Sequence, residues 1–122
     1  MRTKNPLVSV VMNCYNGEKF LEKSLKSLKD QTYKNWELIF FDNNSEDRSL
    51  SIINSFKDKR FKIFKLKKLL YLYHARKLAV KKTKGKYVSF LDVDDLWSPN
   101  KLKYQVKFLQ QNKNYKFCYS NY

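Results

Sequence analysis

The stretch YVSFLDVDD, residues 87–95, decides the fold because it shows where a buried strand ends. Tyr87 to Leu91 is a short apolar run of the kind that forms a strand inside a sheet. It leads directly into Asp92-Val93-Asp94-Asp95, which places three carboxylates in four positions. Like charges this close repel one another unless a cation neutralises them. Magnesium and manganese prefer oxygen ligands of this type.

The Asp-x-Asp pattern is short and common, and a solvated acidic turn is the competing interpretation. In that case Asp95 would do no more than stabilise the N-terminus of the following helix. Here the pattern ends an apolar strand, in a chain with only 11 Asp and Glu residues. We therefore favour a site for Mn²⁺ or Mg²⁺, with Asp94 and Asp92 as ligands.

Working outward, the sequence alternates between two periodicities. Apolar runs typical of strands occupy residues 7–12, 36–41, 61–66 and 87–91, and a further strand is expected at 116–120. Helical spacing occurs around residues 20–28, 45–56, 71–82 and 98–109, and Gly85 is placed to end the third of these helices. This order predicts an α/β fold with a mostly parallel sheet and helices on both faces, ending after about the fifth strand.

Polar residues follow several of these strands. In open parallel sheets, ligands collect at the carboxyl ends of the strands. Asn13 and Tyr15 come after the first strand, Asp42 after the second, and Asp92 and Asp94 after the fourth. We expect these residues to converge on one edge of the sheet.

Each remaining candidate has a functional and a structural interpretation. Asp42 can accept a hydrogen bond from a base edge or a ribose hydroxyl, or close a turn within its own loop. Tyr15 can stack on a flat base or pack over the end of the sheet. Arg76 can pair with a diphosphate or with the aspartates after residue 91, or it can be an ordinary surface arginine.

Other features exclude some classes of protein. With two glycines, the chain cannot build a Rossmann fingerprint or a Walker A loop, so phosphate must be held by metal and side chains. Cys14 and Cys118 are far apart in a chain with one histidine, which argues against zinc and favours free thiols. The N-terminus lacks the apolar core of a signal peptide, and no apolar run approaches the ~20 residues of a membrane span. We expect a cytoplasmic protein.

The net charge of +15 is the strongest feature of the composition. A basic surface attracts nucleic acid, anionic lipid or phosphorylated small molecules. No helix-turn-helix, zinc finger or RNP-like motif is present, so a nucleic-acid-binding domain is the less favoured alternative. Peripheral contact with the inner face of an anionic membrane is a hypothesis from charge alone. The lysines are scattered through nearly every segment, so the charge is equally consistent with compositional background.

Taken together, several segments resemble family 2 glycosyltransferases. They are VSVVMNCYNG (8–17), SL (24–25), QTY (31–33), WELI (36–39), DNNS (42–45) and KGKYVSFLDVDDLW (84–97). The resemblance covers nearly the whole chain and implies the GT-A fold, which is Rossmann-like. It implies metal-dependent transfer of a sugar from a nucleoside-diphosphate donor, a UDP-sugar first, to an acceptor hydroxyl, usually with inversion. Bacterial surface polysaccharide or lipid-linked glycan synthesis is the implied setting, with a glycan or a lipid-linked molecule as acceptor.

The resemblance also implies roles for particular residues. The position of Tyr15 packs on the base, and that of Asp42 binds the base edge. The position of Asp92 faces ribose or metal, that of Asp94 ligates the metal under the diphosphate, and Arg76 matches a basic residue near the nucleotide. The substrate-binding residues are therefore expected to be Asn13, Tyr15, Asp42, Arg76 and Asp92.

The sequence departs from the family pattern at several positions. The family usually has Pro where Asn13 stands, and Thr or Ser where Cys14 stands. Lys77 follows Arg76 where Asn is usual, and the segment Leu69–Tyr73 lacks the Gly often found before that arginine.

No general base can be assigned from the sequence. An inverting transfer needs one, and after Asp95 the sequence has no Asp or Glu. We therefore assign no catalytic residue and expect the base beyond residue 122. Residues 1–122 are interpreted as a single domain, the N-terminal part of a longer catalytic domain. A non-catalytic nucleotide-sugar-binding module is the alternative.

Overall fold

The computed structural model describes residues 5–120, which alternate between strand and helix. The elements, in chain order, are β1 (Val8–Cys14), α1 (Leu21–Lys29), β2 (Trp36–Asp42), α2 (Ser49–Phe56), β3 (Phe61–Lys65), α3 (Leu72–Val80), β4 (Tyr87–Phe90) and α4 (Lys101–Gln111). The eight elements fall within four residues of the boundaries that the sequence periodicity predicts, and the largest differences are at the starts of α2 and α4.

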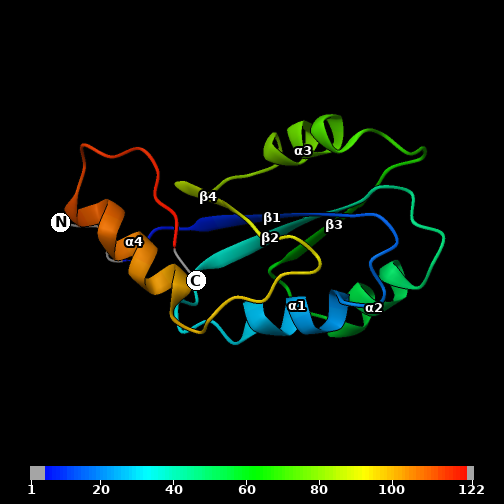
Figure 1. Cartoon of the computed structure of the whole chain (residues 1–122), viewed down its shortest axis with the longest axis horizontal. Helices are drawn as coiled ribbons and strands as arrows, with labels where there is room; N and C mark the ends of the chain where they lie inside the picture. The colour runs from blue at the N-terminus through cyan, green and yellow to red at the C-terminus, as the bar shows by residue number, and fades with distance from the viewer. Residues whose placement is uncertain (1–4, 121–122) are drawn as a thin grey trace.

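The strands form one parallel sheet in the order β3-β2-β1-β4 (Figure 1). β1 pairs along its whole length with β2, and its residues Val8–Val11 pair with Tyr87–Phe90 of β4. Strands β2 and β3 extend the sheet on one side of β1, and β4 lies on the other. The strand order therefore reverses at β1, and such a reversal is where open α/β sheets bind ligands. The predicted α/β fold with a parallel sheet is confirmed.

Helices cover both faces of this sheet. Alternate side chains of β1 pack into the main core with α1, α2 and α4, and these are Val8, Val10, Met12 and Cys14. Val11 points to the other face, where it packs with Ile39, Phe41 and Ala79 of α3. Figure 1 shows α3 on one side of the sheet and α1 and α2 on the other. Because both faces are covered, β1 and β2 are almost entirely buried, which is why they are continuous apolar runs in the sequence.

The fifth strand expected at residues 116–120 is not formed, and this prediction is wrong for the part of the chain that the structure describes. Gln105 Nε2 of α4 donates a hydrogen bond to Ser120 Oγ at 3.0 Å, which holds the segment to the helix rather than to the sheet. Phe117 and Tyr119 remain 78% and 81% exposed. Strand propensity alone does not form a strand where the backbone has no neighbouring strand to pair with.

Gly85 also has a different role from the predicted one, because α3 already ends at Val80. Gly85 N donates to Ser9 Oγ at 2.7 Å as the chain enters β4 beside β1. A Cβ atom on Gly85 would lie 2.6 Å from Ser9 N and 2.8 Å from Leu7 O, both of which are backbone atoms. The glycine is therefore required by the close approach of two backbones, and not by a helix end.

A buried carboxylate lies at the same corner of the sheet. Glu37 is 7% exposed, and its Oε2 accepts hydrogen bonds from Ser9 Oγ at 2.6 Å and from Lys84 N at 2.8 Å. Hydrogen bonds of this kind compensate for removing a charge from water. The corner thus ties β1, β2 and the start of β4 together at the end of the sheet opposite the ligand-binding edge.

None of the helices in residues 5–120 has the length and apolar character that crossing a membrane requires.

We predict that Gly85→Ala destabilises the fold by about 1–3 kcal/mol, since backbone atoms of β1 must shift to admit the methyl group. Urea denaturation followed by circular dichroism measures the change. The control is Lys84→Ala, the neighbouring exposed side chain, which should change stability by less than about 0.5 kcal/mol. Equal stability of Gly85→Ala and Lys84→Ala would contradict this role for the glycine.

Candidate functional site

A pocket of about 870 Å³ opens at the carboxyl ends of β1 and β2. One wall comes from the end of β1 and the loop after it, with Asn13, Cys14 and Tyr15, and Asn43 follows β2. The opposite wall is the segment Lys68–Leu72, together with His74 of α3. The loops after β1, β2 and β3 leave the sheet together at the right of Figure 1. A pocket of this size accepts a small organic ligand.

Several buried polar atoms in this region have no hydrogen-bond partner among the described residues. Both side-chain atoms of Asn13 are in this state, and so are Asp42 Oδ1 and Arg76 Nε. Buried polar groups in proteins are almost always paired, so unpaired ones call for an explanation such as a ligand. Asn13 lines the pocket directly, which makes its amide the best placed of these groups to contact a bound molecule.

Asp42 is fully buried and does not line the pocket. Its Oδ2 accepts a hydrogen bond from Ser45 N at 3.0 Å, so the carboxylate closes the turn after β2. This is the structural role that the sequence leaves open for Asp42. The other carboxylate oxygen, Oδ1, has no partner among the described residues, and its contact with a base stays a prediction.

Asn43 lines the pocket and was not predicted from the sequence. Its Nδ2 donates to Leu70 O at 2.7 Å, and its Oδ1 accepts from Leu70 N at 2.8 Å. The side-chain amide thus pairs with both backbone polar atoms of Leu70, as a neighbouring strand would, and fixes the opposite wall of the pocket. In the sequence, Asn43 is recognisable only as a turn-forming asparagine after a strand. Its partner, Leu70, lies 27 residues away, so no local pattern reveals the contact.

Tyr15 lies at the mouth of the pocket and is 46% exposed, as a stacking residue requires. The loop that carries it is held by the loop after β2. Gly17 N donates to Ser49 Oγ at 2.9 Å, and Glu18 N donates to Asp47 Oδ2 at 3.0 Å. Burial raises the pKa of the Asp47 carboxyl, but hydrogen bonds from Ser49 and Glu18 outweigh this and hold the pKa below its usual value. The position of Tyr15 therefore depends on a charged clamp between two loops.

The thiol beside Tyr15 is not a nucleophile. Cys14 and Cys118 are both free, but only Cys14 is fully buried, and burial is the main cause that raises the pKa of the Cys14 thiol. A protonated, buried thiol is unreactive.

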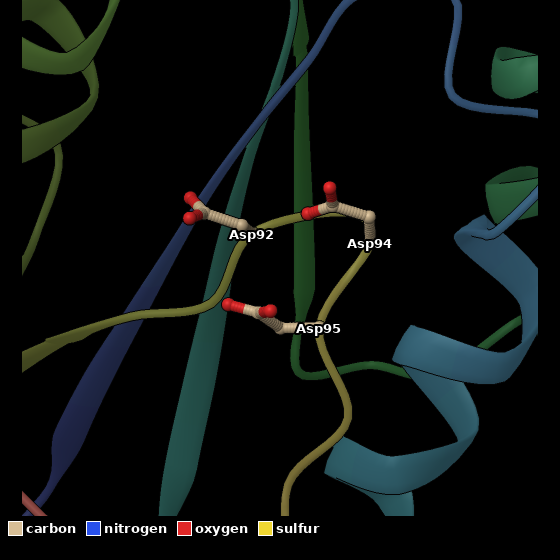
Figure 2. A group of neighbouring side chains, drawn as sticks. All are labelled: Asp92, Asp94 and Asp95. Carbon is tan, nitrogen blue, oxygen red and sulfur yellow. The ribbon is translucent and has the colours of Figure 1, made fainter.

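The three carboxylates predicted after β4 gather at one point. Asp92, Asp94 and Asp95 are exposed, and one carboxylate oxygen from each lies within 4.8 Å of the others. Figure 2 shows the three side chains projecting from a single turn of the chain. Exposed carboxylates at this spacing present the hard oxygen donors that Mg²⁺ and Mn²⁺ accept, so the residues fit such an ion. Asp95 joins the two aspartates that the sequence assigns to the metal.

The turn that carries the three carboxylates, residues 92–95 and here named the acidic turn, is held by polar residues of α1. Ser24 is fully buried, and its Oγ donates to the backbone oxygen of Asp92 at 3.1 Å. Ser27 Oγ accepts from Trp97 N at 3.1 Å. Val93, between the aspartates, packs over Gly17, where an added Cβ would lie 3.3 Å from Val93 Cγ2. The turn is thus held through its backbone and Val93, while its three carboxylates stay exposed.

Gln31 extends this support beyond α1. It is fully buried, its Nε2 donates to Ser98 O at 2.7 Å, and its Oε1 accepts from Leu102 N at 3.1 Å. Residues 24–25 and 31–33 belong to the segments that carry the family resemblance, and these contacts give them a physical role.

Arg76 lies beside the carboxylate cluster. Its Nη2 is 3.5 Å from Asp92 Oδ1, and its guanidinium lies 5.3 Å from the centre of the Phe90 ring. Both side chains of the ion pair are partly exposed, at 41% and 62%, so the pair contributes little to stability. The predicted pairing of Arg76 with an aspartate is present, and the arginine lies on the same helix as His74 of the pocket.

The pocket and the acidic turn are neighbours at the reversal of strand order. Leu91 N donates to Val11 O at 3.0 Å, which continues the β1–β4 register past Phe90. Asp92 follows Leu91 directly and therefore lies at the same end of the sheet as Asn13 of the pocket wall. Fold and site together define a parallel α/β protein with a pocket of about 870 Å³ beside a cluster of three exposed carboxylates.

The chain belongs to glycosyl transferase family 2, whose family model matches residues 9–122. It is 38% identical over 116 residues to the UDP-Glc:alpha-D-GlcNAc-diphosphoundecaprenol beta-1,3-glucosyltransferase WfgD of Escherichia coli. That alignment covers 95% of this chain and 46% of WfgD. The E. coli protein WfaP, of the same description, is 39% identical over 116 residues, with the same coverage.

The fold is also similar to that of S. aureus TarS. A crystal structure of TarS in complex with UDP-GlcNAc superimposes with a TM-score of 0.81 at 28% sequence identity. It covers 87% of this chain and 32% of that one. A second TarS structure contains UDP and gives a TM-score of 0.82. The chain thus spans about half the length of the E. coli relatives and about a third of the TarS 1–349 chain.

We predict that Asp47→Ala lowers stability by about 1 kcal/mol at pH 7, because Glu18 N and Ser49 lose their acceptor. The folded-state pKa of Asp47 is lowered, so its contribution is present above the ordinary value of 3.8 and is lost as the pH falls below it. Urea midpoints measured from pH 7 to pH 3 should therefore converge for Asp47→Ala and the unaltered protein.

The control for this prediction is Glu46→Ala, which removes the exposed carboxylate of the residue immediately before Asp47. It should leave the midpoint nearly unchanged at every pH. If the urea midpoints of Asp47→Ala and the unaltered protein differed by the same amount at every pH, the proposed role of the Asp47 carboxylate in holding the two loops together would be wrong.

Proposed function

We propose that this chain binds the nucleoside-diphosphate sugar donor of a glycosyltransferase, and that the donor is a UDP-sugar. One observation carries the proposal: a pocket with unpaired buried polar groups lies beside three convergent carboxylates, at the reversal of strand order. The names of the E. coli relatives specify UDP-Glc, and TarS has been crystallised with UDP and UDP-GlcNAc.

The base and ribose are proposed to occupy the pocket. Tyr15 offers an exposed ring for stacking, and the Asn13 amide offers one donor and one acceptor that are otherwise unpaired. The wall that Asn43 fixes through Leu70 closes the other side. Asp42 Oδ1 is buried and has no hydrogen-bond partner among the described residues, and we propose that it accepts a hydrogen bond from a ribose hydroxyl or a base edge, the role that the family resemblance implies.

The diphosphate is proposed to lie toward the acidic turn. Asp94 and Asp92 would hold Mn²⁺ or Mg²⁺, with Asp95 in the same cluster. A divalent cation supplies the positive charge that stabilises a leaving nucleoside diphosphate. Arg76 is placed to contribute a fixed positive charge to the same region, since its Nη2 already contacts Asp92.

The proposed reaction is transfer of the sugar with inversion. The acceptor hydroxyl oxygen forms a bond to the anomeric carbon as the bond to the diphosphate oxygen breaks, and a general base takes the hydroxyl proton. We assign that base to no residue of this chain. Residues 1–122 are proposed to be the N-terminal, donor-binding part of a catalytic domain with the greater length of its relatives.

For the acceptor, we propose a glycan or a lipid-linked molecule in bacterial surface polysaccharide synthesis. The E. coli relatives act on a diphosphoundecaprenol-linked GlcNAc by name. Such an acceptor would place the protein in the cytoplasm, peripherally at the inner face of the membrane.

Isothermal titration calorimetry with UDP, with and without Mn²⁺, tests the proposal. We expect Mn²⁺ to strengthen binding of UDP, and Asp94→Ala to reduce that gain by at least about tenfold, because one of the clustered oxygen donors is removed. The matched control is Asp30→Ala, an exposed aspartate after α1, which should behave as the unaltered chain.

Two outcomes would point elsewhere. UDP binding that neither needs nor responds to Mn²⁺, and that Asp94→Ala leaves intact, would remove the metal from the proposal. Failure to bind UDP, combined with metal-independent binding to duplex DNA that falls steeply with salt, would favour a nucleic-acid-binding domain. Release of sugar from a UDP-sugar by this chain would separate an enzyme from a non-catalytic binding module.

A further inference from the structure

The segment between β3 and α3 exposes an unusual number of large apolar side chains. Leu69 and Leu72 are each 53% exposed, Tyr73 is 69% exposed and Tyr71 is 84% exposed. Lys67 and Lys68 precede them and are also exposed. Single exposed apolar residues are ordinary, but four within five positions form a patch that calls for a partner.

The patch is held in this orientation by the fold. Leu70, in the middle of the segment, is tied through both backbone polar atoms to the side-chain amide of Asn43. Leu69 and Tyr71 line the pocket together with Leu70, but they remain 53% and 84% exposed, so each also presents a large surface to solvent. The exposed tyrosine therefore belongs to a fixed segment and not to a freely moving loop.

Helix α3 continues the same surface. Its buried residues, Ala75 and Ala79, pack toward the sheet. On another side of the helix, Tyr73, Lys77 and Lys81 line a shallow hollow together with Leu72, which also lines the nucleotide pocket. The exposed apolar residues of the segment and the lysines of α3 thus form one continuous surface, on the opposite face of the sheet from α1 and α2 (Figure 1).

The segment of the chain that forms this region is basic. Residues 59–91 contain twelve Lys and Arg residues and no Asp or Glu. The basic residues of the surface itself are Lys67, Lys68, Arg76, Lys77 and Lys81, and Arg76 is paired with Asp92 at its edge. A surface that combines lysines with exposed tyrosine and leucine complements a partner that is both anionic and apolar.

We propose that this surface, formed by residues 67–73 and the exposed side of α3 and here named the Tyr71 surface, docks on an anionic lipid bilayer. Tyrosine rings lie at the boundary between water and lipid because one end is apolar and the other is wet. The lysine stems can cover apolar surface while the ammonium groups meet anionic headgroups. The alternation of aliphatic, aromatic and basic side chains fits a bilayer better than single-stranded nucleic acid, which would use the tyrosines but not Leu69 and Leu72.

The biological purpose of this docking rests on the proposed function, because a lipid-linked acceptor would be met at the membrane. Docking by the Tyr71 surface would bring the wall of the nucleotide pocket, Lys68–Leu72, close to the headgroups. The donor-binding proposal and the membrane-docking proposal can be tested independently, because UDP binding is measured without lipid and vesicle binding is measured without nucleotide.

Co-sedimentation with vesicles tests the surface. The full chain should bind vesicles of phosphatidylglycerol mixed with phosphatidylcholine, and bind phosphatidylcholine alone far more weakly. The double variant Tyr71→Ser, Tyr73→Ser keeps the charge and should lower the partition coefficient at least about tenfold. The matched control is Tyr104→Ser, Tyr119→Ser, which removes two tyrosines of similar exposure, 61% and 81%, from α4 and the segment after it.

A depth measurement keeps the test independent of folding defects. Tryptophan is introduced as Tyr73→Trp or, as the control, Tyr104→Trp, and quenching by lipids with brominated acyl chains is compared. The native Trp36 and Trp97 are buried in both variants, so they contribute a common background. We expect strong quenching only for Tyr73→Trp.

Equal loss of vesicle binding in the two double variants, or equal quenching at positions 73 and 104, would overturn the proposal in favour of unspecific attraction by the net charge. Weaker binding of single-stranded RNA in Tyr71→Ser, Tyr73→Ser, with vesicle binding unchanged, would overturn it in favour of a nucleic-acid surface.

Discussion

The parallel pairing of β1 with a strand on each side is the constraint on which the site depends. Because β2 and β4 both run parallel to β1, the chain leaves each of these strands at the same edge of the sheet. Asn13, Asn43 and Asp92 are far apart in the sequence, yet the register brings them to this edge. The reversal of strand order at β1 separates the loops on either side of Asn13 and leaves room there for a ligand.

Around this edge, the loops are held by side chains that bond to distant backbone. Loop backbone lacks the regular hydrogen bonds of a sheet, so side chains supply hydrogen bonds instead. Asn43 bonds to the backbone of Leu70, Asp47 to that of Glu18, and Ser24 to that of the acidic turn. These contacts use the turn-forming and helix-surface polar residues of the sequence for positioning. They leave the Asn13 amide unpaired and the clustered carboxylates exposed, with Asp92 in contact only with Arg76 among the ion pairs of the described residues, and this division between supporting and available groups is what a binding site requires.

The sequence was sufficient for the features that depend on short-range pattern. Apolar runs followed by polar turns predicted the four strands, and the spacing of Asp92 and Asp94 after a strand predicted the acidic cluster. The fifth strand was wrong because pairing depends on a neighbour that a local pattern does not reveal. Asn43 and the true role of Gly85 were missed because each depends on a contact with backbone far away in the sequence. For the same reason, only the structure showed that Asp42 is buried and closes its own turn.

The most direct test of this account is an NMR titration of the isotope-labelled chain with UDP and a trace of Mn²⁺. The paramagnetic ion broadens the signals of nearby amides only. The account predicts that UDP shifts the amides of residues 13–15, 43 and 68–72, and that Mn²⁺ selectively broadens residues 92–95 together with residue 13. Broadening centred on other carboxylates, such as Glu37 or Asp58, or UDP shifts confined to a different part of the surface, would contradict a single donor site at the carboxyl edge of β1 and β4.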